Sequence, residues 1–285
     1  AAFAGSYSDF ITDYNTDGTN IDSRVKASDT TGFSIVSYIG TGANGTVGHG
    51  LSAAPDWIVI RDLDSTNDWP VYHSSLANTE FIKLNSPNAR STGETTIWNS
   101  TSPTTTTFSL GTSNLANNNG KRHIAYCWTA TSGYSAFGKY TGNSSATGPR
   151  IYTTDDGTST GSNGFRPAFI IIKRAITTSS GSWVIVDATR ETVNNRTKVL
   201  LANDATVVES TGYADIEFFS DGFQLKDAGG STNNSSSTYI YAAFADTRDA
   251  AFWLDQSSND NDWQPENLDH NDTVLDSPTD NFATM

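Results

Sequence analysis

The stretch DYNTDG at 13–18 carries the pattern D-x-[DN]-x-[DN]-G, which opens many calcium-binding loops. Carboxylate and amide oxygens in this spacing can bind Ca²⁺, and the glycine can make the sharp turn. The twelfth position is Arg24 rather than the bidentate Glu of an EF-hand. Asp and Asn in this spacing also form ordinary turns by bonding their own backbone, and we favour that interpretation. The alternative is a calcium site, the one cofactor that the sequence suggests, with the ligands Asp13, Asn15, Asp17 and Asp22.

Other patterns of catalytic residues are weak or missing. GTGANG at 40–45 matches the dinucleotide pattern G-x-G-x-x-G, but the chain continues with TVGHGLSAAP, where no helix can begin to hold a pyrophosphate. H-E-x-x-H does not occur, so a zinc-protease site is not expected. GTSTG at 157–161 matches G-x-S-x-G, but it is followed by SNGFRP, where no helix can begin, so a hydrolase elbow is not expected either. The single cysteine, Cys127, lies in HIAYCWTA and is expected to be a small core residue.

Sugar chemistry would need paired acids or exposed aromatic rings. A glycosidase uses two carboxylates about 5–10 Å apart, and the glutamates between residues 80 and 217 have no spacing that brings two of them together. An exposed Trp can stack on a sugar ring through its apolar face. We expect burial for any single Trp, and glycan binding is the alternative. The candidates, which have no clear counterpart in the internal repeat described next, are Trp98, Trp253 and Trp263.

Elements that could position such residues recur along the chain. PDWIVIR at 55–61 and PAFIIIK at 167–173 both place a proline and an aromatic residue before three β-branched residues and a base. Five such matches occur in the same order, which predicts a tandem repeat. The matched pairs are 32–42 with 133–143, 55–61 with 167–173, 68–73 with 182–187, 108–111 with 219–222, and 123–130 with 239–246.

Every matched segment is short, rich in β-branched or aromatic residues, and bounded by Gly, Pro, Asn or Ser, which is typical of strands. The apolar runs WIVI and FIII indicate strands that are covered on both faces or central in a sandwich. IEFFSDGFQL at 216–225 predicts a hairpin with its turn at Asp221-Gly222. Helical candidates are short, at 23–27 and 189–194.

We therefore predict an all-β fold of two tandem antiparallel β-sandwich modules, jelly-roll-like in character. The predicted divisions are a polar N-terminal segment at 1–31, a first module at 32–132, a second module at 133–249 and an acidic C-terminal linker at 250–285.

Composition limits the partners. The formal net charge is −14, from 31 acids against 17 bases, so neither nucleic acid nor an anionic membrane face is expected as a partner. Charged residues make up only 17% of the chain, which predicts an uncharged polar surface. No stretch approaches the roughly 20 apolar residues of a membrane span, and no signal peptide is visible. Because the chain starts without Met, we expect a piece of a longer polypeptide.

The repeated segments GFSIVSYIGTG, TVGHGLSAAPDWIVIR, NGFRPAFIIIKR, FFSDGFQLK and TYIYAAFAD resemble β-modules of large tailed-phage structural proteins, especially those of marine and cyanobacterial phages. The closing NDWQPENLDHNDTVLDSPTDNFAT resembles the linker that precedes a SPRY-like module in such proteins. The resemblance covers most of residues 32–285. It implies a virion appendage on the particle surface: a tail fibre, a tailspike-like protein, or a head fibre or decoration.

Such appendages commonly form homo-oligomers, often trimers, contact other virion proteins and in many cases bind host surface glycans. The main hypothesis is thus a non-enzymatic virion structural protein that acts as a spacer or host-contacting arm. The alternatives are a carbohydrate-binding module that recognises host surface glycans and a polysaccharide-degrading tailspike enzyme. The resemblance brings no catalytic residues to this chain.

Overall fold

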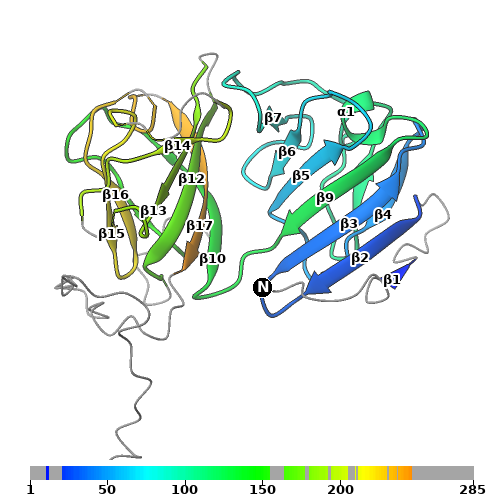
Figure 1. Ribbon diagram of the computed structural model, residues 1–285, viewed down its shortest axis with the longest axis horizontal. Coiled ribbons are helices and arrows are strands. Elements are labelled where there is room, and N and C mark those ends of the chain that lie inside the picture. Colours follow the sequence, from blue (N-terminus) through cyan, green and yellow to red (C-terminus); the bar gives the residue numbers. More distant parts are fainter. Residues whose placement is uncertain are drawn as a thin grey trace, which may run out of the picture.

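The chain folds into antiparallel β-sheets with almost no helix (Figure 1). The computed structural model describes residues 11–12, 21–154, 164–176, 180–191, 194–204, 209, 211–229, 231–235 and 237–245. Within these ranges the one helix is α1 (Asn114–Asn117). The predicted all-β class is confirmed.

Residues 11–131, called the first half below, hold a large sheet and a small one. Their strands are β1 (Ile11–Thr12), β2 (Ser23–Ser28), β3 (Phe33–Ile39), β4 (Gly45–Gly48), β5 (Trp57–Asp62), β6 (Pro70–His73), β7 (Ile82–Lys83), β8 (Thr107–Leu110) and β9 (Arg122–Trp128). The large sheet has the order β1-β2-β3-β9-β5-β6-β7, and β4 pairs with β8 in the small one.

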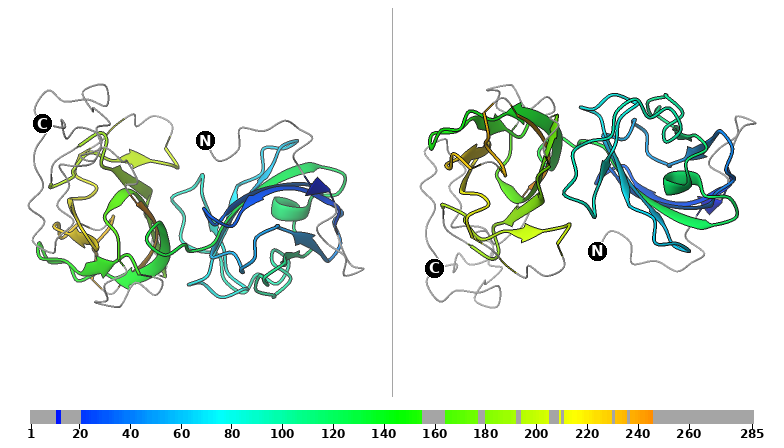
Figure 2. Two further views of the ribbon diagram at one scale, coloured as in Figure 1. Left: turned by 90° about the horizontal axis from the view of Figure 1, so that it is seen from below. Right: turned by 90° about the horizontal axis from the view of Figure 1, so that it is seen from above.

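Residues 132–245, the second half, repeat this division. Their strands are β10 (Ser135–Thr141), β11 (Arg150–Tyr152), β12 (Pro167–Ile176), β13 (Trp183–Asp187), β14 (Leu200–Leu201), β15 (Ile216–Phe219), β16 (Gly222–Leu225) and β17 (Thr238–Ala245). The large sheet has the order β10-β17-β12-β13-β14, and the small one the order β11-β16-β15. Figure 2 shows the two halves side by side, joined by a short connection between β9 and β10.

Both halves have the same strand order. The run β3-β9-β5-β6-β7 in the first large sheet corresponds position by position to β10-β17-β12-β13-β14 in the second, and β4-β8 corresponds to β11-β16. Four of the five sequence matches fall on these corresponding strands.

The fifth match was placed on the wrong strand. Phe108 of β8 pairs with Val47 of β4, and Phe223 of β16 pairs with Ile151 of β11, so Phe108 corresponds to Phe223. The predicted match of 108–111 with 219–222 therefore aligns β8 with the end of β15, whereas the true counterpart of β8 is the next strand, β16. Strand β15 has no counterpart in the first half. The sequence FSDG at its end resembles FSLG at 108–111, which explains the wrong match.

The continuous apolar runs are explained by burial of both faces of a central strand. Successive side chains of a strand point to opposite faces. In β5, Ile58 and Ile60 enter the core between the large and small sheets of the first half, whereas Trp57 and Val59 lie in a separate cluster with residues of the second half. In β12, Ile170 and Ile172 likewise enter the core of the second half, and Ile171 joins the shared cluster.

Two buried asparagines anchor corresponding loops. Asn117 donates from Nδ2 to the carbonyl oxygens of Ala43 and Gly111, at 2.7 Å each, and its Oδ1 accepts from the N–H of Thr41 at 2.7 Å. Beside this loop a Cβ on Gly40 would lie 2.2 Å from the carbonyl oxygen of Asn118. The loop after β3 therefore requires glycine at this position.

The second half repeats this arrangement. Asn233 donates to Ser145 O and Asp227 O, at 2.9 and 2.7 Å, and accepts from the N–H of Asn143 at 2.9 Å. A Cβ on Gly142 would lie 2.4 Å from a backbone oxygen there. Neither anchor was predicted from the sequence, although each half carries a glycine after its first shared strand and an Asn pair before its last one.

Three local expectations turn out differently or in part. Residues 23–28 form β2, which pairs with β3 along its whole length, so part of the segment predicted as polar and separate belongs to the first large sheet. The same residues are a strand rather than a helix, because Ser23 and Val25 alternate inward around the exposed Arg24. The hairpin at 216–225 is confirmed, but its register joins Phe219 to Gly222 and leaves Ser220-Asp221 as the turn.

Candidate functional site

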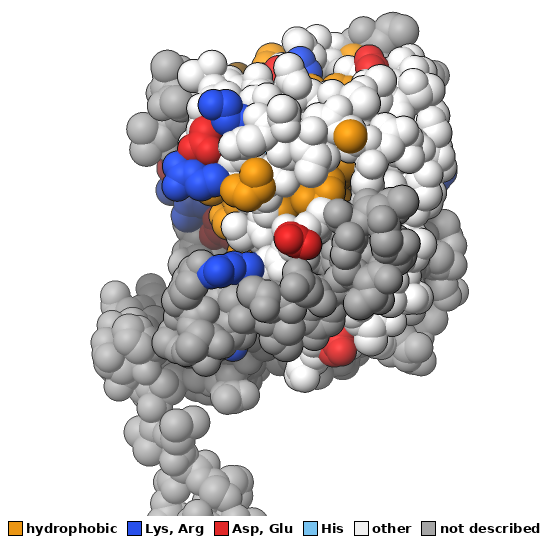
Figure 3. Space-filling model, turned by 90° about the vertical axis from the view of Figure 1, so that its right-hand side faces the viewer, with side chains coloured by type: hydrophobic (Ala, Val, Ile, Leu, Met, Phe, Trp, Pro, Cys, Tyr) orange, Lys and Arg blue, Asp and Glu red, His pale blue; other side chains and the backbone are white. Residues whose placement is uncertain are grey.

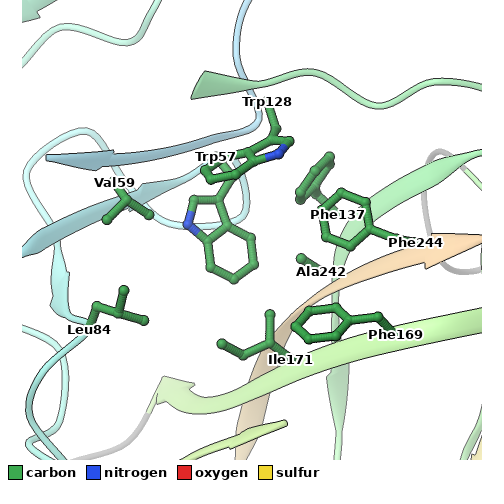
Figure 4. A pocket seen from close by; sticks show the side chains of 9 residues that line it. All are labelled: Trp57, Val59, Leu84, Trp128, Phe137, Phe169, Ile171, Ala242 and Phe244. Atoms are coloured by element: carbon green, nitrogen blue, oxygen red, sulfur yellow. The ribbon is translucent and has the colours of Figure 1, made fainter. Parts of the chain in front are cut away.

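The candidate site is an apolar cleft of about 190 Å³ where the outer faces of the two large sheets meet (Figure 4). The first half contributes side chains from β5, β9 and the loop after β7, and the second half contributes side chains from β10, β12 and β17. The lining residues are Trp57, Val59, Leu84, Trp128, Phe137, Phe169, Ile171, Ala242 and Phe244.

Aromatic rings dominate this cleft. The Trp57 ring lies 6.4 Å from Trp128 within its own half, and 5.9 Å from Phe137 and 5.8 Å from Trp183 across the halves. The Trp128 and Phe137 contacts are edge-on, the arrangement favoured by the ring quadrupoles. Trp57 is only 4% exposed, so it lies at the centre of the contact between the halves.

The indole N–H of Trp57 is buried, and none of the described residues accepts a hydrogen bond from it. The other two fully buried indoles have partners: Trp98 donates to Glu80 O at 3.0 Å, and Trp183 donates to Lys83 O at 2.8 Å. A buried donor without an acceptor costs about 1–3 kcal/mol. Trp57 therefore carries a buried donor that no described residue satisfies and that does not open onto the cleft.

Polar contacts away from the cleft lining also join the halves. Lys173 is fully buried and donates from Nζ to the carbonyl oxygens of Pro87 at 3.1 Å and Asn88 at 2.9 Å, both in the other half. Burial lowers the pKa of Lys173 to about 8, and the charge of Arg174 acts in the same direction. The backbone N–H of Gly181 also donates to Pro87 O, at 2.8 Å.

His73 makes a further contact between the halves. Its Nδ1 accepts from the N–H of Ser75 at 3.0 Å, which leaves the proton of the neutral ring on Nε2, where it points to Tyr241 O at 3.2 Å. Burial lowers the pKa of this imidazole to about 4. The uncharged ring is thus fully hydrogen-bonded.

The glycan-binding candidates are not brought together. Trp98 is 2% exposed, packs edge-on against Tyr72 with the ring centres 5.8 Å apart, and has its indole N–H bonded. Trp98 therefore has no face free for a sugar, and the expectation of burial is confirmed for it. Trp253 and Trp263 lie outside the described residues.

The calcium candidates fall mostly outside the part of the chain that the structure describes. The structure does not describe Asp13, Asn15 or Asp17. Asp22 is exposed and lines a hollow together with Thr41. Within the described ranges no group of three or more His, Cys, Asp or Glu side chains could hold a metal ion.

None of the described glutamates lines the apolar cleft or the hollow beside Asp22. Burial raises the pKa of Asp215, and the nearby charge of Glu217 adds to this effect, but neither residue lines the apolar cleft or the hollow beside Asp22. Four of the glutamates considered above have partners: Glu80 with Arg90, Glu209 with Lys198, Glu217 with Lys226, and Glu191 with the backbone of Thr197 and Lys198.

The surface fits the composition. Figure 3 shows the end of the molecule formed by the first half, where uncharged polar side chains and backbone outnumber charged groups and the apolar groups lie in several small areas near the middle and toward the top. Among the described residues, the large apolar side chains that are clearly exposed are Ile39 and Leu63.

A family model described as a domain of unknown function (DUF7483) matches residues 10–248. The chain belongs to this family. The DUF7483 match runs from β1 to beyond β17, so one family unit contains both halves and the cleft between them. No curated protein and no solved structure matches the chain. No helix within the described ranges has the length and apolar character that crossing a membrane would require.

Proposed function

We propose that the chain is a non-enzymatic structural protein of a phage virion, a spacer or host-contacting arm built from two tandem β-sandwich modules. The observation that carries this proposal is the repeated strand order together with the contact between the two copies. Each module keeps the loop anchor formed by Asn117 or Asn233, so the copies preserve a shape.

The contact between the modules is built for rigidity. The outer faces of both large sheets are apolar, and the buried Lys173 reaches across to two backbone carbonyls. Separating the modules would expose these apolar side chains to water and leave the carbonyls to find new partners. A spacer must hold its two ends at a fixed distance, which a flexible linker between the modules would not do.

Stiffness can be measured directly on the whole chain. Nitroxide labels at the exposed positions Thr105 and Ala146, one in each half, should give a single narrow distance distribution. The buried Cys127 should stay unlabelled in the folded protein and leave the two introduced cysteines as the reactive sites. A broad distribution would contradict the rigid-arm proposal.

The virion assignment has its own test. Antibodies against this chain, used with gold labelling in electron microscopy of purified particles that encode it, should mark an appendage. The same images would report the copy number, and a homo-oligomer such as a trimer is the expected state. Particles without the chain would refute the assignment.

A further inference from the structure

A buried histidine and a buried aspartate face each other at the ends of two neighbouring strands of the first half. His123 in β9 and Asp62 in β5 are both fully buried, and His123 Nε2 lies 3.9 Å from Asp62 Oδ2. That distance is too long for a direct hydrogen bond. Among the described residues, His123 Nε2 has no other hydrogen-bond partner either.

The hydrogen bonds around this pair define what each atom can do. His123 Nδ1 lies 3.0 Å from the carbonyl oxygen of Lys121 and must donate to it, so Nε2 of the neutral ring is an acceptor. Asp62 Oδ2 accepts from the side-chain amides of Asn67 and Asn118, at 3.2 and 3.0 Å. Its Oδ1 accepts from a backbone N–H at 2.9 Å. Two acceptors therefore point at each other across 3.9 Å.

The surroundings favour these protonation states. Burial lowers the pKa of His123, against the opposing effects of the Lys121 carbonyl and of Asp62, so the ring is neutral at pH 7. Burial raises the pKa of Asp62, but hydrogen bonds, the largest of them from Asn118, outweigh burial and lower this pKa overall. Two acceptors can be joined only by a donor that lies between them.

The second half shows which atom takes the corresponding position. His123 stacks on Tyr38, its partner across the strands, with the ring centres 5.1 Å apart. In the second half Tyr239 stacks on Tyr140 at the same distance. The Tyr239 hydroxyl lies farther from the backbone than any atom of an imidazole would, and it accepts from the N–H of Asn234 at 2.9 Å. An oxygen atom thus lies beyond the stacked ring in the second half, and His123 does not supply one in the first.

We propose that the first half binds one water molecule between His123 and Asp62, in the place of the Tyr239 hydroxyl. The water donates to His123 Nε2 and to Asp62 Oδ2, since two atoms 3.9 Å apart leave room for an oxygen about 2.8 Å from each. It connects β9 with β5 and, through the amide of Asn118, with the residue that follows α1. A buried water that satisfies otherwise unpaired polar groups is costly to remove. This site is independent of the proposed virion role.

Two measurements on the full chain test the site directly. Long-range ¹H–¹⁵N NMR spectra at pH 7 should show the His123 ring protonated at Nδ1 alone. A crystal structure at a resolution that shows ordered water should contain one oxygen about 2.8 Å from both His123 Nε2 and Asp62 Oδ2.

Two variants at one position test what the water contributes. His123→Tyr should bring its own hydroxyl, as Tyr239 does in the second half, and should remove the ordered oxygen while keeping the melting temperature near the wild-type value. His123→Phe has the same ring without the hydroxyl. Its melting temperature should be about 2–4 °C lower than that of His123→Tyr, the shift expected for one net hydrogen bond in a chain of this size.

Four results would each overturn the proposal. A proton on Nε2 would mean that the ring donates directly to Asp62 and needs no water. The absence of an ordered oxygen between the two side chains would exclude the site. An atom closer than about 2.3 Å to both side chains would be a metal ion rather than a water. Equal melting temperatures of His123→Tyr and His123→Phe would show that this position does not require an oxygen.

Discussion

Acid should loosen the contact between the two halves through His73. This side chain is fully buried, with Nδ1 bonded to the N–H of Ser75 and Nε2 bonded to the carbonyl of Tyr241 in the other half. Burial lowers its pKa from 6.5 to about 4, and the charge of Lys139 acts in the same direction, whereas the bond to Tyr241 O opposes them. A second proton would have to enter at Nδ1, where the N–H of Ser75 already points.

The direction and size of the effect follow from proton linkage. Between pH 6.5 and about 4 the unfolded chain binds a proton at this histidine and the folded chain does not. The contribution of His73 is therefore fully present above pH 6.5 and is lost as the pH falls toward 4. The difference between the two pKa values corresponds to about 3 kcal/mol in the free energy of unfolding.

His73→Asn is the matched variant. In the second half the corresponding strand ends with Asp187, whose Oδ1 accepts from the N–H of Thr189 at 2.9 Å, so a short oxygen acceptor suits this position. Asparagine supplies that acceptor for Ser75 and does not titrate. Burial also lowers the pKa of His49 and His123, so the wild-type loss alone would not identify His73.

Urea unfolding of both proteins at pH 8 and pH 4 measures the difference. The wild-type free energy of unfolding should fall by about 3 kcal/mol more than that of His73→Asn. The His49→Asn variant, measured in parallel, should still lose the free energy of unfolding that protonation of His73 removes between pH 8 and pH 4. Parallel pH dependence of the wild type and His73→Asn would show that His73 is not a buried neutral ring, and the reasoning would fail.

Three further predictions concern other buried groups. Asn117→Ala and Asn233→Ala should each lower the free energy of unfolding by about 2–4 kcal/mol in urea titrations, because each removes at least three hydrogen bonds in a closed loop; a cost at only one site would contradict the equivalence of the two loops. Cys127 should resist a thiol reagent at pH 8 until urea is added, because burial raises its pKa to about 12; rapid labelling of the folded chain, detected by mass spectrometry, would be the contrary result. Trp183→Phe should cost about 1 kcal/mol and broaden the nitroxide distances, since its indole no longer donates to Lys83 O; an unchanged distribution would show that this contact does not hold the halves together.

Much of the strand pattern could be predicted from the sequence because it is local. The alternation and turn residues of 216–225 specify a hairpin, and the run from Trp57 to Ile60 specifies a strand with two buried faces. The residues that cover the outer face of that strand come from distant parts of the sequence. Only the folded chain shows that Trp57 and Val59 pack against residues from β10, β12 and β17.

The elements that the sequence assigned wrongly or left open share a physical reason. In β2 the inward positions include Ser23, which is too weak a signal to mark a strand, and the pairing with β3 decides the conformation. Trp98 lies between β7 and β8, where no sequence match guides the alignment, and its burial depends on Tyr72 and on the Glu80 carbonyl. A tryptophan is suited equally to a core and to a sugar ring, so its sequence alone leaves both open.

The contact between the halves uses equivalent surfaces of the two copies. The register of each large sheet places Trp57 opposite Trp128 and Phe169 opposite Phe244, and these four residues line one cleft. A surface that pairs with its own copy forms a closed pair, whereas a head-to-tail contact would continue into a ring or a filament. Once paired, the halves have no such face left for a further copy. Any assembly of several chains must therefore use a different surface, and substitutions in the cleft should separate the halves without affecting such an assembly.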